Sequence, residues 1–157
     1  MKQAEKFNRP IVTFINTSGA FCDVDSEDRG IGEAIAESLL VMSQLTVPFI
    51  AIFIGEGGSG GALALVMGNE VWMLENTMYS VLSRSDEAAK VMKLTPDDLF
   101  SLDVIDKIIM ETRRKVARKS DDVMLELKQE LSAKLKELKQ LTPAELVEQR
   151  QKRFRNY

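Results

Sequence analysis

The sequence predicts an α/β protein with a helical C-terminal tail, and three features support this. Residues 49–54 are apolar without alternation, which is typical of a strand covered on both faces. Residues 26–45 carry apolar side chains at helical spacing, as an amphipathic helix does. In residues 124–138 apolar side chains recur every three or four positions along a highly charged segment. A chain of 157 residues with 45% apolar side chains is long enough to bury one core.

The first half of the chain is expected to form a strand, a helix and a second strand. Residues 11–15 are β-branched or aromatic, which predicts a buried strand. Residues 16–25 are rich in turn-forming side chains and are expected to form a loop. The predicted helix over residues 26–45 follows, and the predicted strand over residues 49–54 comes next along the chain.

The second half is expected to continue with shorter elements. Residues 61–67 predict a buried helix that begins inside a glycine-rich stretch. Short β-branched and aromatic runs predict strands at residues 71–74, 78–82 and 104–109. Thr95 precedes a proline and two aspartates, which is the pattern of a capped helix start.

The C-terminal tail is expected to be helical. A single apolar stripe over residues 124–138 predicts one long amphipathic helix. Thr142 and Glu145 form a capping-box pattern with a proline between them, which predicts the start of another helix. We therefore expect a core at residues 1–110 and a helical segment at residues 111–157.

Composition argues against several classes of function. A formal charge of −3 and a pI near 5.2 disfavour a general nucleic-acid or anionic-membrane surface. The basic run at residues 113–119 precedes two aspartates, so it predicts a solvated helix start rather than a phosphate or partner patch. Absence of histidine rules out a Ser-His-Asp triad. Cys22 is the single cysteine, so neither a disulfide nor a Cys-rich zinc site is expected within the chain.

Location and assembly also follow as expectations. The chain opens without a secretory signal and contains no apolar run long enough to span a bilayer, so a cytoplasmic location is expected. Residues 61–67 and 124–138 offer more apolar surface than so small a body easily covers. An assembly with a partner is therefore expected rather than a monomer.

The glycine-rich stretch at residues 54–62 reads Ile-Gly-Glu-Gly-Gly-Ser-Gly-Gly-Ala and holds five of the nine glycines. It lies between a predicted strand and a predicted helix, where the first helical turn offers unpaired N–H groups. Three interpretations stay open. The N–H groups stabilise an oxyanion, or they cradle a phosphate, since residues 55–60 formally match G-x-G-x-x-G. The third is that the glycines only allow close packing of strand on helix.

The glycine stretch and its flanks are similar to those of a known family. The most specific matches are residues 54–64, 73–76 and 79–81, and residues 1–7, 27–30, 33–36 and 153–155 match as well. Together, and in order along the chain, they resemble the carboxyltransferase α subunit of bacterial acetyl-CoA carboxylase.

That resemblance implies a crotonase-like fold of ββα turns and an α₂β₂ assembly with a zinc-bearing β subunit. In this family the assembly moves a carboxyl group from carboxybiotin to acetyl-CoA, which gives malonyl-CoA for fatty-acid synthesis. Biotin is carried by the biotin carboxyl carrier protein and charged by biotin carboxylase. The resemblance thus implies neither biotin attached to this chain nor a metal on it.

The resemblance also implies which residues form the site. The backbone amides of Gly60 and Gly61 are expected to stabilise the oxyanion on the ureido oxygen of biotin. The other residues expected to face carboxybiotin are Gly57, Gly58, Ser59, Gly19 and Ala20. Backbone donors suffice here because biotin, once CO₂ has left, can itself take the proton from the acetyl methyl group.

Side chains near these glycines have simpler expected roles. Glu56 is expected to cap nearby N–H groups, and Arg29 to pair with a neighbouring acid rather than with a CoA phosphate. Ser59 has no base beside it in the sequence, which disfavours a role as nucleophile. Phe53 and Trp72 are expected in the core.

The chain departs from the family at several places. Where the family has Pro-Gly-Ala-Tyr-Pro-Gly, residues 18–23 read Ser-Gly-Ala-Phe-Cys-Asp, without the prolines that stiffen the loop. Ser83 runs directly into Arg84 without the family's Pro-Glu-Gly segment, and the Gly-Gly-Ala-His stretch expected after Ile109 is missing. Family members also begin well before the point that matches Met1. A true deletion and a sequence that lacks mobile segments are both consistent with these gaps.

Two alternatives to an active α subunit stay open. A truncated or divergent member of the crotonase superfamily would serve only as an assembly scaffold. An enzyme of the same fold that acts on another acyl-CoA, such as a hydratase or decarboxylase, would need Glu56 or Glu75 as acid or base.

Overall fold

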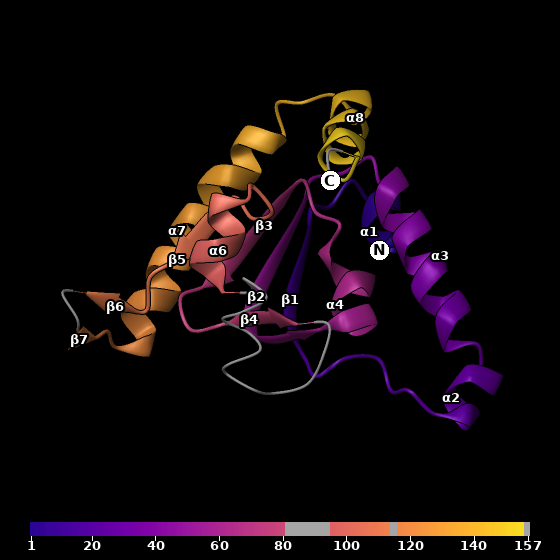
Figure 1. The fold of residues 1–157 in the computed structure, drawn as a ribbon. Coiled ribbons are helices and arrows are strands. Elements are labelled where there is room, and N and C mark those ends of the chain that lie inside the picture. Colours follow the sequence, from indigo (N-terminus) through magenta and orange to yellow (C-terminus); the bar gives the residue numbers. More distant parts are fainter. Residues whose placement is uncertain (81–94, 114–115, 156–157) are drawn as a thin grey trace.

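A mainly parallel sheet with helices on both faces forms the body of the computed structural model, which describes residues 1–80, 95–113 and 116–155 (Figure 1). The strand order is β1-β2-β3-β5, and each neighbouring pair is parallel. These strands are β1 (Ile11–Thr17), β2 (Phe49–Gly58), β3 (Glu70–Leu74) and β5 (Lys107–Ile109). A short strand β4 (Met78–Ser80) pairs in parallel with the end of β2. The α/β prediction is confirmed.

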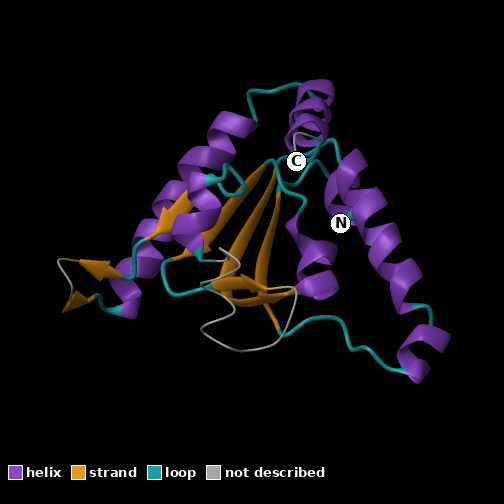
Figure 2. Ribbon diagram, viewed as in Figure 1, coloured by secondary structure: helices purple, strands orange, loops and turns teal. Residues whose placement is uncertain are grey.

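The two faces of the sheet belong to two hydrophobic clusters, because successive side chains of a strand point to opposite faces. In β2, Phe49, Ala51 and Phe53 lie in one cluster, whereas Ile50 and Ile52 lie in the other. Helices α3 (Ile31–Gln44) and α4 (Ser59–Val66) cover the first face, and α7 (Ser120–Leu138) covers the second (Figure 2). The prediction that residues 49–54 are covered on both faces is therefore confirmed for residues 49–53.

Two predicted core side chains lie where expected. Trp72 is 1% exposed and belongs to the cluster under α7, and Phe53 is 2% exposed and belongs to the other cluster. The ring of Phe53 also makes an edge contact with that of Tyr79, with 5.4 Å between the ring centroids.

The single helix predicted over residues 26–45 is wrong in its extent. The chain forms a short helix α2 (Val24–Asp28) and then α3, with α1 (Lys2–Lys6) near the N-terminus. Gly30 separates α2 from α3 in the left-handed region, at φ +78° and ψ 36°. Glycine adopts this conformation without a steric cost. The backbone helix is therefore interrupted at Gly30, although the helical spacing of apolar residues in the sequence continues across it.

The predicted end of the strand over residues 49–54 is also wrong, because the strand extends into the glycine-rich stretch. Strand β2 continues through Gly55 to Gly58, and α4 begins at Ser59. The extra length is stabilised by pairing, since Gly57 is the register partner of both Thr17 in β1 and Tyr79 in β4. The predicted helix over residues 61–67 thus begins two residues earlier.

Most short elements of the second half are confirmed with shifted bounds. Helix α6 (Pro96–Ser101) begins as predicted, and the Thr95 side chain accepts the Asp98 N–H. Strand β5 is shorter than the predicted strand over residues 104–109, because the N–H groups of Val104 and Ile105 donate to the Leu99 carbonyl in α6 instead. Residues 81–82 of another predicted strand lie outside the described residues, as does the Ser83–Arg84 junction.

The basic run was predicted to start a helix, and the structure places most of it elsewhere. Strands β6 (Thr112–Arg113) and β7 (Val116–Ala117) form an antiparallel pair before α7 begins. The Arg118 guanidinium binds the Glu126 carboxylate and donates a 3.0 Å hydrogen bond to the Met110 carbonyl. Part of the basic charge is therefore neutralised within the chain.

The apolar stripe on α7 is largely covered by the sheet, which corrects the expectation of surplus apolar surface there. Leu127 is 4% exposed and Leu138 is 2% exposed, and only Met124 of the stripe is substantially exposed, at 44%. The capping box of Thr142 and Glu145 is confirmed at the start of α8 (Pro143–Arg153). None of the helices in the described ranges is both long and apolar enough to cross a membrane.

Candidate functional site

The β2–α4 junction packs directly against the loop that follows β1. A Cβ on Gly61 would lie 2.8 Å from the carbonyl carbon of Gly19 and 3.0 Å from the Ala20 nitrogen. A Cβ on Gly58 would lie 2.6 Å from the Gly19 nitrogen and closer still to the Ser18 carbonyl. The structure thus brings together the two segments that sequence resemblance assigned to one site.

The loop after β1 has local reasons for its shape. Gly19 lies at φ +126°, which a residue with a side chain rarely adopts, and its N–H donates to Thr17 Oγ1 at 3.2 Å. Asn16 Oδ1 accepts the Glu56 N–H at 3.1 Å, and the missing side chain of Gly55 makes room for the Asn16 carboxamide. The Asn16 side chain therefore ties the end of β1 to β2, and the Thr17 side chain holds the glycine of the loop.

Helix α4 begins abruptly at a strained residue. Ser59 lies in the left-handed region at φ +38°, directly after Gly58 in extended conformation. Such a residue costs about 1–3 kcal/mol and persists where the surroundings impose it. Further along, Thr13 Oγ1 donates to the Leu65 carbonyl at 2.8 Å, which anchors the far end of α4 to β1.

The first turn of α4 offers backbone donors in a fixed position. The N–H groups of Ser59, Gly60 and Gly61 have no carbonyl partner within the helix, and the helix dipole makes this end positive. Packing on both sides holds these groups in place, which is what an oxyanion site requires. The arrangement can stabilise negative charge on an oxygen without an ionisable side chain.

Packing alone explains several of the glycines. A side chain on Gly57 would run into the Phe53 ring and lie 3.2 Å from the Tyr79 ring, and those on Gly58 and Gly61 would meet backbone. Gly60 is different, because its Cβ would meet only Ile35 Cδ1 at 3.0 Å and the Ala20 methyl at 3.8 Å. Packing therefore accounts for glycine at positions 57, 58 and 61 but not at position 60.

The phosphate interpretation loses support. In a dinucleotide fingerprint the first glycine forms the tight turn after the strand. Here Gly55 and Gly57 lie within β2 and pair or pack as strand residues. The formal match to G-x-G-x-x-G is thus not reflected in the geometry.

Glu75 is a structural brace rather than an acid or base. Its carboxylate accepts hydrogen bonds from Thr112 Oγ1 at 2.7 Å, Thr112 N–H at 2.7 Å and Glu111 N–H at 2.8 Å. The bond from the Thr112 side chain is the main cause that lowers the pKa of Glu75, with the two N–H groups adding to it. A carboxylate so held stays ionised and joins the end of β3 to the chain after β5.

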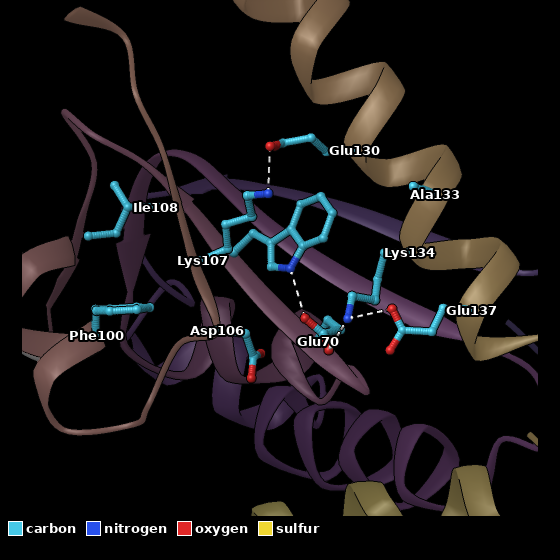
Figure 3. A pocket seen from close by; sticks show the side chains of 10 residues that line it. Glu70, Phe100, Asp106, Lys107, Ile108, Glu130, Ala133, Lys134 and Glu137 are labelled. Carbon is cyan, nitrogen blue, oxygen red and sulfur yellow. Dashed lines mark hydrogen bonds and ion pairs between the residues drawn. The ribbon is translucent and has the colours of Figure 1, made fainter.

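A hollow away from this junction lies between β3, β5, α6 and α7, with a volume of about 630 Å³ (Figure 3). Lys107 Nζ binds Glu130 at 2.6 Å and lies 5.5 Å from the centre of the Trp72 ring. Trp72 Nε1 donates to Glu70 at 3.0 Å, and Lys134 binds Glu70 and Glu137. Sequence reasoning missed this network, because its members are far apart in the chain. Its charges largely pair with one another and tie α7 to the sheet.

No metal site is found in the part of the chain that the structure describes. No group of three or more Cys, Asp or Glu side chains there could hold a metal ion.

The fold is shared with several solved structures of low sequence identity. A Pseudomonas malonate decarboxylase hetero-tetramer in complex with coenzyme A matches 87% of this chain and 62% of its own, at a TM-score of 0.72 and 16% identity. A probable enoyl-CoA hydratase from Mycobacterium smegmatis matches 99% of this chain and 71% of its own, with a TM-score of 0.62 and 16% identity. The chain is thus a crotonase-like α/β protein, as predicted.

The sequence is similar to one family over its whole length. The family model described as acetyl co-enzyme A carboxylase carboxyltransferase-like matches residues 1–157. The acetyl-coenzyme A carboxylase carboxyl transferase subunit alpha of Streptococcus gordonii strain Challis is 52% identical over 170 aligned residues, and that of Streptococcus pneumoniae strain Hungary19A-6 is 51% identical. This chain belongs to the acetyl-CoA carboxylase carboxyltransferase-like family. It spans 65% of the length of these relatives.

Proposed function

We propose that this chain acts as the carboxyltransferase α subunit of acetyl-CoA carboxylase, which transfers a carboxyl group from carboxybiotin to acetyl-CoA to form malonyl-CoA. The observation that carries the proposal is the first turn of α4, whose backbone donors are held between β2 and the loop after β1. Membership of the family supplies the substrate class. The proposed product supports fatty-acid synthesis.

The donor set fits the proposed substrate. Carboxybiotin supplies the carboxyl group, and transfer develops negative charge on an amide-like oxygen. The N–H groups of Gly60 and Gly61 would bind that oxygen, and Gly57, Gly58, Ser59, Gly19 and Ala20 would shape the surrounding wall. One such donor is typically worth about 3 kcal/mol of transition-state stabilisation.

The proposed assembly extends beyond this chain. A zinc-bearing β subunit would hold acetyl-CoA in an α₂β₂ complex, and the biotin carboxyl carrier protein and biotin carboxylase would deliver carboxybiotin. Biotin is then a substrate group rather than a covalent part of this chain. We also propose a cytoplasmic location and the division into a core at residues 1–110 and a C-terminal segment at residues 111–157.

Removing a single backbone donor tests the proposal. Gly60 is the second residue of α4, where proline is tolerated because its N–H has no partner within the helix. We expect Gly60→Pro, combined with the β subunit, to lower the rate of malonyl-CoA formation from carboxybiotin and acetyl-CoA at least 100-fold. Gly60→Ala adds a Cβ at the same position and keeps the N–H, so it controls for that added carbon. Equal rates for the two variants would contradict the proposal.

A second candidate function is a non-catalytic assembly subunit. The alignment with the relatives extends over 170 residues, 13 more than this chain has, so at least 13 aligned positions have no counterpart here. The packing role of the glycines also stands without any chemistry. Such a subunit would bind the β subunit as an active α subunit does, yet the complex would form no malonyl-CoA above the background rate.

A further inference from the structure

Arg150 in α8 is a charged side chain that is 0% exposed. Its Nη1 donates to the carbonyl oxygens of Met42 at 2.9 Å and Leu45 at 2.7 Å, where α3 ends. Its Nη2 donates to Asn69 Oδ1 at 2.7 Å and to the Val47 carbonyl at 3.3 Å. One guanidinium thus joins the C-terminal helix to the end of α3, to the chain before β2 and to the chain before β3.

Among the described residues, carbonyl dipoles rather than a directly bound carboxylate compensate the Arg150 charge. Burial lowers the pKa of Arg150 to about 10, and the negative charge of Glu5 opposes this shift. The side chain is therefore still protonated at neutral pH. The last turn of a helix carries unpaired carbonyls and the negative end of the helix dipole, which suits a buried cation.

Asn69 extends the same connection to the central strand. Its Oδ1 accepts the Phe49 N–H at 3.2 Å, at the start of β2, as well as the Arg150 guanidinium. Its Nδ2 donates to the Leu146 carbonyl and to Gln149 Oε1, both at 2.9 Å and both in α8. The beginning of β2 and the end of α3 are thus held to one helix.

Helix α3 links this clamp to the glycine site. Figure 1 shows α8 beside the C-terminal end of α3, whose length runs alongside α4. Ile35, seven residues before Met42, faces the first turn of α4, with its Cδ1 3.0 Å from the position that a Cβ on Gly60 would take. Seven residues of helix span about 10 Å. A shift of α3 along its axis would therefore change the contact that backs the first turn of α4.

We propose that Arg150 is a positioning residue that holds α3 against the first turn of α4 and thereby keeps the backbone donors of Gly60 and Gly61 in place. Its consequence for catalysis rests on the proposed function, whereas its effect on α3 does not. A matched comparison exists on the same helix. Arg153 binds Asp106 at 2.6 Å and the Val104 carbonyl at 2.7 Å, so it clamps α8 to the chain before β5 instead.

Hydrogen exchange by mass spectrometry on the full chain tests the proposal. We expect Arg150→Met to speed exchange about 10-fold or more in peptides that cover α3 and α4, with α7 unchanged. Arg153→Met is expected to leave the α3 peptides at the wild-type rate. An equal increase in all peptides, or none in α3, would overturn the proposal, because the arginine would then contribute only to global stability or to nothing.

A second variant covers the case in which Arg150→Met does not fold. Arg150→Lys keeps the charge but has one ammonium group for four acceptors, so α3 exchange is expected between the wild-type and Met rates. Wild-type exchange in Arg150→Lys would overturn the proposal. If α3 exchange changes as expected while the assembled wild-type enzyme forms no malonyl-CoA, the proposed function fails and the positioning of α3 stands.

Discussion

Replacing Gly58 by alanine is expected to be among the most damaging single-methyl additions in this chain. The new Cβ would lie 2.6 Å from the Gly19 nitrogen and closer to the Ser18 carbonyl, and both are backbone atoms. Side chains can rotate away from a clash, but here either β2 or the loop after β1 must move. The two strands that would have to separate, β1 and β2, form the longest pairing in the sheet.

The expected loss in the free energy of unfolding follows from the kind of atoms that the new methyl group would meet. Overpacking by one methyl typically costs about 1–3 kcal/mol, and a clash with backbone belongs at the upper end, near 3 kcal/mol. Domains have free energies of unfolding of about 5–15 kcal/mol, so this is a large fraction. For a chain of this size the melting temperature would fall by roughly 6–12 °C.

Urea unfolding provides the assay, because Trp72 is the single tryptophan and is 1% exposed, so its fluorescence reports unfolding of the sheet. Gly32→Ala is the matched control. Gly32 lies in α3, and the nearest atom to its Cβ would be Glu27 Oε2 at 3.9 Å, so alanine is expected to raise stability by about 0.5–1 kcal/mol. A Gly58→Ala variant within 0.5 kcal/mol of wild type would refute the packing of the loop against the junction.

Two further predictions concern Glu75 and the stripe on α7. Because the folded state lowers the pKa of Glu75 below its ordinary value of 4.5, its contribution is present above pH 4.5 and is lost as pH falls through the lowered pKa. Glu75→Gln should therefore unfold at lower urea concentration than wild type at pH 7, with a gap that narrows below pH 4.5; a constant gap would contradict this. Leu127→Ala should lower the free energy of unfolding by about 2–4 kcal/mol, because Leu127 is only 4% exposed. Met124→Ala should lower it by less than about 1 kcal/mol, because Met124 is 44% exposed. Equal costs in urea unfolding would mean that the stripe is not covered by the sheet.

Local patterns predicted the elements whose causes are local. The apolar run at residues 49–53, the capped starts at Thr95 and Thr142 and the periodic α7 all appear, because side-chain spacing and capping act within a few residues. The same patterns failed at Gly30 and at residues 55–58. There a left-handed glycine breaks a continuous periodicity, and pairing with β1 and β4 extends a strand through glycines.

The site was predicted in part. The glycine stretch was identifiable because bare backbone between a strand and a helix offers free N–H groups, and the family resemblance added Gly19 and Ala20. The contact of these two segments at Gly58 and Gly61 is visible only in the tertiary structure. So is the brace at Glu75, which the sequence left as a candidate acid or base until its three hydrogen-bond donors were seen.

The sequence by itself determined the α/β class, the family and the presence of a backbone-donor segment, since each depends on the order of residues along a short stretch. Tertiary structure alone decided what surrounds that segment. Arg150 shows the difference, because it reads as one more charge on a polar helix, yet its acceptors lie 81 to 108 residues away in the chain. No local pattern records which distant carbonyls a folded chain brings to one guanidinium; burial and hydrogen bonding decide this only once the chain is folded.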